Sequence, residues 1–256
     1  MHLHLRPGNE ADVPNFVSTV LAAFSTNPIH QRCLPRDSDK AHAFWRDAFT
    51  EELKDPNAYF LVVEAQPSPS DSPSQPTLGS QTQPQPKSSS QPETPEPKAQ
   101  KVDEDGEGVF VGFAKWNYIP ADTVLPPLPD DDAWPAEPKL ATYFFGMLNE
   151  RHAGIMGGRE HWYLELVCTK PEYMGRGAGK LLVNWGCQRA DERGVEAYLD
   201  STPDASARGV YEKFGFRTVE SASFDEGRAL EVDGVQGGYV TCFMLRSPMH
   251  VRGTGD

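Results

Sequence analysis

The stretch Pro171-Glu172-Tyr173-Met174-Gly175-Arg176-Gly177-Ala178-Gly179-Lys180-Leu181-Leu182 carries glycine at every second position from 175 to 179. Large apolar residues over 162–169 predict a strand before it, and an apolar face over 177–193 predicts a helix that ends at Gly194. Glycine permits close backbone approach, and a helix start presents unpaired N–H groups and a positive dipole end. Together they predict a phosphate or pyrophosphate site, to which Arg176 and Lys180 add positive charge.

Two common phosphate-binding loops do not fit this spacing. A P-loop would need glycine at position 174 and Ser or Thr at position 181, where Met174 and Leu181 stand. A dinucleotide-binding G-x-G-x-x-G loop that starts at Gly175 would need glycine at position 180, which is Lys180. The pyrophosphate therefore belongs to another kind of ligand.

The stretch 171–182 resembles the acetyl-CoA loop of the GCN5-related N-acetyltransferase (GNAT) superfamily, Gln/Arg-x-x-Gly-x-Gly/Ala after a strand. Met174 departs from the Gln/Arg position but keeps the backbone N–H that the family points at the pyrophosphate. A second stretch, Ala207-Arg208-Gly209-Val210-Tyr211-Glu212-Lys213-Phe214-Gly215-Phe216, resembles the A-x-x-x-Y-x-x-x-G-F helix and turn of the same family. The two motifs stand in the family's order and spacing.

The resemblance implies a splayed strand pair whose gap receives the pantetheine arm of acetyl-CoA, and it implies a general acid, Tyr211, that protonates the departing CoA thiolate. The implied cofactor-binding residues are the end of the strand and the glycine loop: Val167, Cys168, Thr169, Met174, Gly175, Arg176, Gly177, Ala178, Gly179 and Lys180. No metal is implied. The competing interpretation of Tyr211 is a core tyrosine on an amphipathic helix.

Glu165 is the first candidate for the base that deprotonates the amine. It alternates with Leu164 and Leu166, which predicts that it points to the opposite face of the strand, toward the cleft. A solvent-facing glutamate is the competing interpretation, and Glu160, His161 and Asp200 are lesser candidates. Asp204 is expected to cap a helix N-terminus. Three aromatic residues are candidates for the lining of an acceptor pocket, with plain core packing as the competing interpretation: Trp116, Tyr118 and Trp134.

The rest of the chain predicts a single domain over residues 1–250, with a flexible tail at 251–256. Residues 66–105 are dominated by Pro, Ser, Gln and Thr, which predicts a disordered insertion, and the 23 prolines of the chain fit it. Strands at 59–63 and 109–114 flank it, so it is expected to enlarge a hairpin loop rather than to link two domains.

Further elements are expected around these strands: an edge strand at 2–6, helices at 13–24 (capped by Asn9), 38–53 and from Pro138 onward, a strand at 195–199, a helix at 205–214 and a strand at 239–245. This order predicts an α/β (α+β) fold. Its centre is a mixed, mostly antiparallel twisted sheet flanked by helices.

Composition narrows the class of protein. The net charge of −13 and the lack of a Lys/Arg run argue against a nucleic-acid partner, and no apolar run approaches the length of a membrane span. The four cysteines stand far apart with no metal-ligand spacing, which predicts buried thiols, a reducing compartment and a cytoplasmic protein. An acidic chain is also compatible with a cationic substrate.

The sequence therefore predicts an enzyme that moves an acetyl group from acetyl-CoA to a primary amine of a small molecule or peptide, by direct attack in a ternary complex. Cys168 is the residue that could challenge direct attack. Two alternatives stay open: a catalytically weak or inactive acyl-CoA-binding module, which Met174 and Asp204 suggest, and an interaction protein that recruits partners through residues 66–105. The acceptor and the oligomeric state are not readable.

Overall fold

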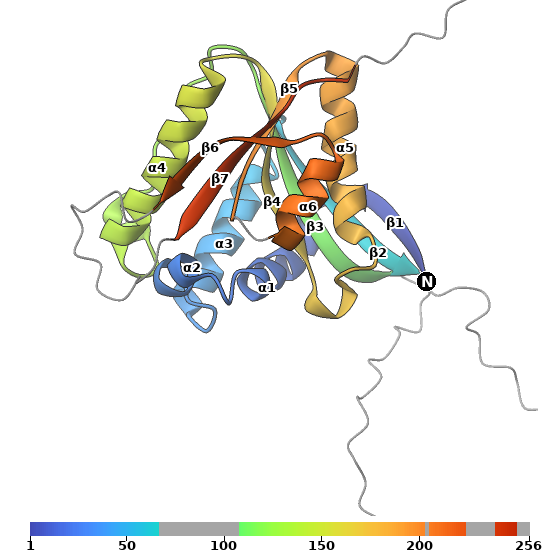
Figure 1. The fold of residues 1–256 in the computed structure, drawn as a ribbon. Helices are drawn as coiled ribbons and strands as arrows, with labels where there is room; N and C mark the ends of the chain where they lie inside the picture. Colours follow the sequence, from blue (N-terminus) through green and yellow to red (C-terminus); the bar gives the residue numbers. More distant parts are fainter. Residues whose placement is uncertain (67–107, 203–204, 224–238, 250–256) are drawn as a thin grey trace, which may run out of the picture.

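A seven-stranded sheet forms the centre of the protein in the computed structural model, which describes residues 1–66, 108–202, 205–223 and 239–249 (Figure 1). The strand order is β1-β2-β3-β4-β5-β7-β6. The strands are β1 His2–Pro7, β2 Ala58–Gln66, β3 Val109–Ile119, β4 His161–Thr169, β5 Glu196–Ser201, β6 Arg217–Ser223 and β7 Val240–Arg246. Only β4 and β5 pair in parallel, so the sheet is mixed and mostly antiparallel, as the sequence predicts.

Six α-helices and three short 3-10 turns complete the described part of the chain. They are α1 Val13–Ala23, α2 Pro28–Cys33, α3 Asp39–Glu52, α4 Pro138–Met156, α5 Ala178–Arg193 and α6 Ala205–Lys213, with turns η1 Glu10–Asp12, η3 Asp131–Ala133 and η4 Pro171–Tyr173. Pro138 opens α4 at its first position, and Gly194 ends α5 in the left-handed conformation, both as expected. Asn9 caps η1, which leads directly into α1, rather than α1 itself.

Helices cover both faces of the sheet (Figure 1). On one face, α5 packs over Trp116, Leu164 and Leu199, and Tyr211 of α6 joins this cluster. On the other face, α1 and α3 pack over the aromatic residues of β2 and β3, while α4 packs over Tyr198 of β5. The two faces are thus independent cores that share the central strands, and β4 and β5 contribute to both.

Two elements were not predicted from the sequence. The six-residue α2 is too short to show a helical period, although Asn27 caps it and Pro28 opens it. Strand β6 is the outermost strand next to β7, and most of its side chains are exposed, so it lacks the apolar alternation of a half-buried strand. Several predictions lie outside the described residues: nearly all of the disordered insertion at 66–105, the tail at 251–256 and the cap at Asp204.

Candidate active site

The glycine loop runs from η4 into the first turn of α5. Gly175 and Gly177 have φ angles of 74° and 98°, a region that side-chain-bearing residues rarely adopt. A Cβ added at either position, or at Gly179, would meet no atom within 4 Å. Gly175 and Gly177 are therefore needed for the backbone conformation and not for space beside a neighbouring side chain. The space above the loop is open.

The N-terminus of α5 is uncapped and able to hold an anion. Gly177 is the N-cap residue, and no side chain accepts a hydrogen bond from the first turn. The N–H groups at this helix start consequently have no intrahelical partner and point toward the open space, where the helix dipole favours negative charge. Lys180 lines the same space. A pyrophosphate fits this set of donors.

Strands β4 and β5 separate beside the loop. Their parallel pairing covers only His161–Leu164 against Glu196–Leu199, whereas β4 continues to Thr169. On its other side, β4 stays paired with β3, but Glu165 has no partner there, because Lys115 pairs with Leu166 and Trp116 with Leu164. Glu165 is therefore a bulge residue, and the edge of β4 that faces β5 is open beyond Leu164.

Glu165 faces the cavity because of the bulge and not because of simple strand alternation. Leu164 packs beneath α5, whereas Leu166 packs in the cluster of α1 and α3 on the opposite face. The simple alternation assumed from the sequence is therefore broken, since the extra residue lets Glu165 and Leu166 share one face. Glu165 still faces the cavity, on the side of α3.

One continuous cavity of about 1580 Å³ joins the loop, the gap between β4 and β5, and a space bounded by α1, α2, α3 and α4. Among the residues predicted to bind the cofactor, those that line it are Val167, Cys168, Thr169, Met174, Gly175, Gly177, Ala178, Gly179 and Lys180. Arg176 does not line it, because its guanidinium lies over the ring of Tyr173 at 5.5 Å. Met174 is 58 % exposed.

Tyr211 lies where α6 meets the gap. Its ring is buried beside Phe216, and its hydroxyl forms a hydrogen bond with Ser201 at the end of β5. Burial, with smaller contributions from Cys168 and Asp200, raises the pKa of Tyr211 above its ordinary value. The phenol therefore keeps its proton at neutral pH, as a proton donor must.

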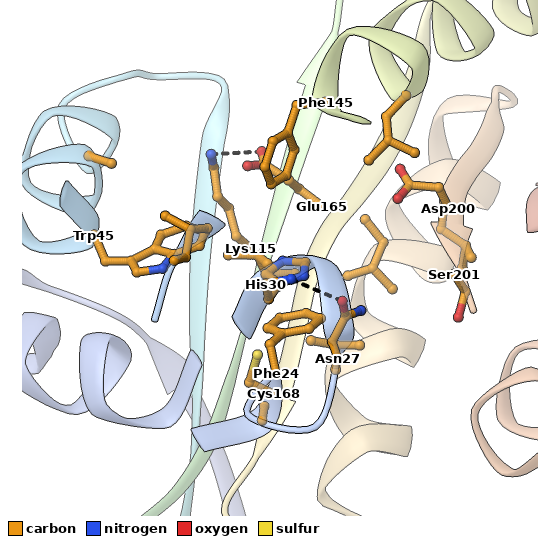
Figure 2. Close-up of a pocket in the computed structure, with 18 of the residues that line it drawn as sticks. Phe24, Asn27, His30, Trp45, Lys115, Phe145, Glu165, Cys168, Asp200 and Ser201 are labelled. Carbon is orange, nitrogen blue, oxygen red and sulfur yellow. Dashed lines mark hydrogen bonds and ion pairs between the residues drawn. The ribbon is translucent and has the colours of Figure 1, made fainter. Parts of the chain in front are cut away.

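Lys115 binds two carboxylates at the cavity wall, Glu52 and Glu165, and Figure 2 shows its contact with Glu165. Its ammonium is 2.6 Å from Oε1 of Glu52 on α3 and 2.7 Å from Oε2 of Glu165, and Asn117 Nδ2 donates to the same Glu165 oxygen at 2.7 Å. Lys115 is only 4 % exposed. Burial and the nearby Glu165 raise the pKa of Glu52 to about 7, although Lys115 opposes the shift.

Asp200 lies across the cavity from this cluster, at the end of β5 (Figure 2). The hydroxyl of Tyr163 donates to its Oδ2 at 3.1 Å, and burial together with the charge of Glu165 raises the pKa of Asp200 to about 6. The ring of His152 packs against Tyr163, and its Nε2 is 2.7 Å from Nε2 of His161. This buried pair explains why His161, a lesser candidate base, does not line the cavity.

Aromatic side chains bound the far end of the cavity. The rings of Phe24 and His30 stack at 4.3 Å, Phe145 meets His30 edge-on at 5.9 Å, and Trp134 stacks on Phe145 at 5.1 Å. Trp116, proposed for this role with Trp134, instead packs beneath α5 and donates to the carbonyl of Leu182 at 3.0 Å. Tyr118 likewise binds Glu160 outside the cavity, at 2.7 Å.

Comparison with protein families identifies this architecture. Residues 85–216 match the model of the acetyltransferase (GNAT) family. The chain belongs to the GNAT family of acetyltransferases. The GNAT fold, its mixed sheet and its parted parallel strands are thus as the sequence predicts.

Solved structures share this GNAT fold over nearly their whole length. Arylalkylamine N-acetyltransferase 2 from Aedes aegypti matches with a TM-score of 0.57 and 12 % identity, over 96 % of this chain and 99 % of that one. Arabidopsis thaliana NAA60, solved with a bisubstrate analogue, matches with a TM-score of 0.51 and 12 % identity, over 96 % and 98 %. At these identities the likeness concerns the fold. A comparison with curated protein sequences gives no match.

The GNAT site contains residues that the sequence did not single out. Asn27 and His30 lie far from Tyr239 in the chain, but Asn27 Nδ2 donates to the hydroxyl of Tyr239 at 2.8 Å across the cavity wall. No local pattern marks such residues, because each is polar or aromatic in a segment without a recognisable motif.

Among the described residues, no helix is both long and apolar enough to cross a membrane.

Proposed function

We propose that this GNAT protein transfers an acetyl group from acetyl-CoA to a primary amine of a small molecule or peptide, by direct attack in a ternary complex. One observation carries the proposal: β4 and β5 part directly beside an uncapped, glycine-lined helix start, with a protonated tyrosine at the same gap. The site thus combines an anion cradle, an open strand edge and an acid.

The backbone would hold acetyl-CoA. The N–H groups of Gly175 to Lys180 suit its pyrophosphate, and the open edge of β4 at Val167, Cys168 and Thr169 suits the amide groups of its pantetheine arm. Arg176, which lies over Tyr173, would act only through its charge. Bound acetyl-CoA supplies an acetyl thioester, whose carbonyl carbon is the electrophile.

Tyr211 would act as the general acid. When the C–S bond breaks, the sulfur leaves with its electron pair and needs a proton, which a buried phenol can give. Glu165 remains a candidate base on the acceptor side, although Lys115 and Asn117 already occupy one of its oxygens.

The state of the cysteines supports direct attack by the amine. Cys168 lies beside the gap, but burial raises the pKa of its thiol to about 12, so it is protonated and a poor nucleophile at neutral pH. All four cysteines are unpaired and buried, which fits a reducing compartment such as the cytoplasm.

We also propose that residues 1–250 are one domain, with residues 66–105 as an insertion between β2 and β3.

A catalytically inactive acyl-CoA-binding module is the second candidate, and the exposed Met174 side chain favours it because it does not support the loop. Thermal unfolding with acetyl-CoA tests binding first, since a bound ligand stabilises by RT ln(1 + [L]/Kd). Release of the CoA thiol with a panel of amines then tests transfer. A thermal shift without thiol release would support the module, and the absence of any shift would contradict both candidates.

A further inference from the structure

Two carboxylates face the acceptor side of the gap from opposite strands. Glu165 on β4 and Asp200 on β5 both lie on the sheet face opposite α5, because their neighbours Leu164 and Leu199 pack beneath that helix. Figure 2 shows them on two sides of the same cavity. Their surroundings differ in one respect that decides their chemistry, which is the presence of a cation.

Glu165 is already compensated. The Lys115 ammonium and the Asn117 amide both hold its Oε2 at 2.7 Å, and Lys115 in turn binds Glu52. One oxygen of this carboxylate is thus occupied, and Lys115 already supplies the cation that binds it. Glu52 is engaged by the same lysine.

Asp200 has no cationic partner among the described residues. The side chain that donates a hydrogen bond to its carboxylate is the neutral hydroxyl of Tyr163. The groups that surround it are likewise neutral or acidic: Tyr163 and Glu165 on β4, Tyr198 on β5, Tyr211 on α6, and Tyr239 before β7. An unpaired carboxylate in a buried wall is costly, and an ammonium group from a ligand would offset that cost.

The position of Asp200 also suits proton transfer. Tyr211 belongs to the core cluster beneath α5, whereas Asp200 faces away from α5, one residue before the Ser201 that binds Tyr211. The acid and Asp200 therefore reach the gap from opposite sides. An amine that attacks from the side of Asp200 would push the thiolate out toward Tyr211.

A second polar group in the same wall lacks a partner. Thr241 on β7 is 3 % exposed, lines the cavity, and its Oγ1 has no hydrogen-bond partner in the described structure. It lies on the strand that pairs with Asp200 and Ser201, next to the Cys242 that faces Ser201. Buried hydroxyls are normally satisfied, and a polar atom of a ligand bound beside Asp200 would satisfy this one.

The far end of the cavity is mainly aromatic, while Asp47, Asp55 and Asp132 line the cavity elsewhere. Phe24, Phe145 and Trp134 form the far end together with His30, whose pKa is lowered to about 4 by burial, so the imidazole is neutral. Such a wall suits a ring or a branched chain.

We infer that Asp200 binds the ammonium group of the acceptor and takes its proton, and that the acceptor is an amine whose body beyond this group is apolar and of about ring size. This inference rests on the proposed acetyl transfer. The apolar surroundings make the transfer feasible, because they disfavour both the ammonium ion and the carboxylate relative to the neutral pair.

The protons and electron pairs balance. The ammonium gives one proton to Asp200, and the nitrogen lone pair forms the C–N bond while the thioester C–S bond breaks. The sulfur leaves with the bonding pair and accepts the phenolic proton of Tyr211. The nitrogen loses its second proton to restore Tyr211, Asp200 releases its proton to solvent, and the products are an amide and the CoA thiol.

The test compares Asp200→Asn with the matched variant Glu165→Gln in the full chain, with 2-phenylethylamine, hexylamine and spermidine as acceptors and CoA-thiol release as the signal. We expect the wild type to prefer the two monoamines over spermidine by at least about tenfold in kcat/KM. D200N should lower kcat with 2-phenylethylamine by roughly 10²-fold or more and leave the KM for acetyl-CoA within about twofold. E165Q should lose less than about tenfold.

The pH profile separates a chemical role from a structural one. Wild-type kcat/KM should rise with pH through about 6, where Asp200 of the free enzyme loses its proton, and this limb should disappear in D200N and persist in E165Q. Asp200→Glu should keep the limb at reduced kcat, and an acetyl-CoA thermal shift in each variant shows that it folds.

Two outcomes would overturn the inference alone: transfer by D200N within a few-fold of wild type, or spermidine as the better acceptor. Failure of the wild type to acetylate any of the amines, despite binding acetyl-CoA, would instead contradict the proposed function and the inference with it.

Discussion

Strands β4 and β5 both border the gap, and each carries a carboxylate there. The surroundings of the two carboxylates differ. On β4, Glu165 lies in a bulge and is held by Lys115, while the backbone beyond it is left open. On β5, Asp200 and Ser201 keep their side chains at the gap, where Tyr163 donates to Asp200 and Tyr211 binds Ser201. In the proposed reaction, β4 therefore contributes mainly its backbone edge and β5 mainly its side chains.

Replacement of Tyr211 by Phe tests the β5 side and should have the largest effect. The ring and its packing remain, but the leaving thiolate loses its proton donor, so we expect turnover to fall by about 10²–10⁴-fold with little change in the KM for acetyl-CoA. Steady-state kinetics of thiol release measure this. Tyr59→Phe, on the surface of β2, is the control, and a Y211F variant with wild-type kcat would refute the acid role.

Replacement of Lys115 by Met tests the β4 side. It leaves Glu52 and Glu165 near each other without a counter-charge, so the free energy of unfolding at pH 7 should fall by about 3–5 kcal/mol. Urea unfolding measures the loss, and the added change Glu52→Gln should restore part of it. Lys54→Met removes an exposed ion pair and should change stability far less than Lys115→Met does. Equal effects of the two lysine changes would contradict the account.

Two glycines near α5 separate ligand binding from packing. Gly177→Ala forces a side chain into a φ of 98° at a site with open space, which costs about 1–2 kcal/mol, so affinity for CoA should fall by roughly tenfold. Gly186→Ala places a Cβ 2.2 Å from the ring of Trp116, so it should reduce stability instead. Calorimetric titration and thermal unfolding measure the two effects.

Gly154→Ala, at an exposed site of α4 with no atom within 4 Å, is the control for both. If G177A kept wild-type affinity for CoA, the glycine loop would not be the pyrophosphate site.

The compensated cluster also predicts a pH dependence of stability. The pKa of Glu52 is about 7 in the folded protein against an ordinary value of 4.5, so the native state binds the extra proton. The stability that this proton contributes is complete below pH 4.5 and is lost as pH rises through about 7. Glu52→Gln should flatten that decline in unfolding measurements from pH 4.5 to 7.5, whereas Glu51→Gln, an exposed neighbour, should leave it unchanged.

Deletion of residues 68–105 should have the smallest effect. The sequence predicts an insertion that forms no part of the core, so acetyl-CoA binding and thiol release should stay within about twofold of wild type. Binding and turnover of the deleted chain measure this. A loss of either would contradict the single-domain proposal and favour a role for the segment in the site.

Sequence patterns anticipated the parts of this fold that depend on neighbours in the chain. The loop at 174–180, the helix start at Pro138 and the position of Tyr211 each follow from a local motif. The bulge at Glu165 and the ion pairs of Lys115 do not, because they depend on the register between β3 and β4 and on a contact with α3. The unpaired state of Asp200 is likewise a property of its surroundings in space.

Transfer of isotopically labelled acetyl from acetyl-CoA to 2-phenylethylamine, followed by mass spectrometry of both the amine and the protein, tests the central claim most directly. The account predicts a labelled amide, CoA thiol in equal amount, no acetylated Cys168, and loss of the amide signal with Y211F. Binding of acetyl-CoA with no labelled amide from this amine or from any other in a broad panel would contradict it, and labelled Cys168 on the path to product would contradict direct attack.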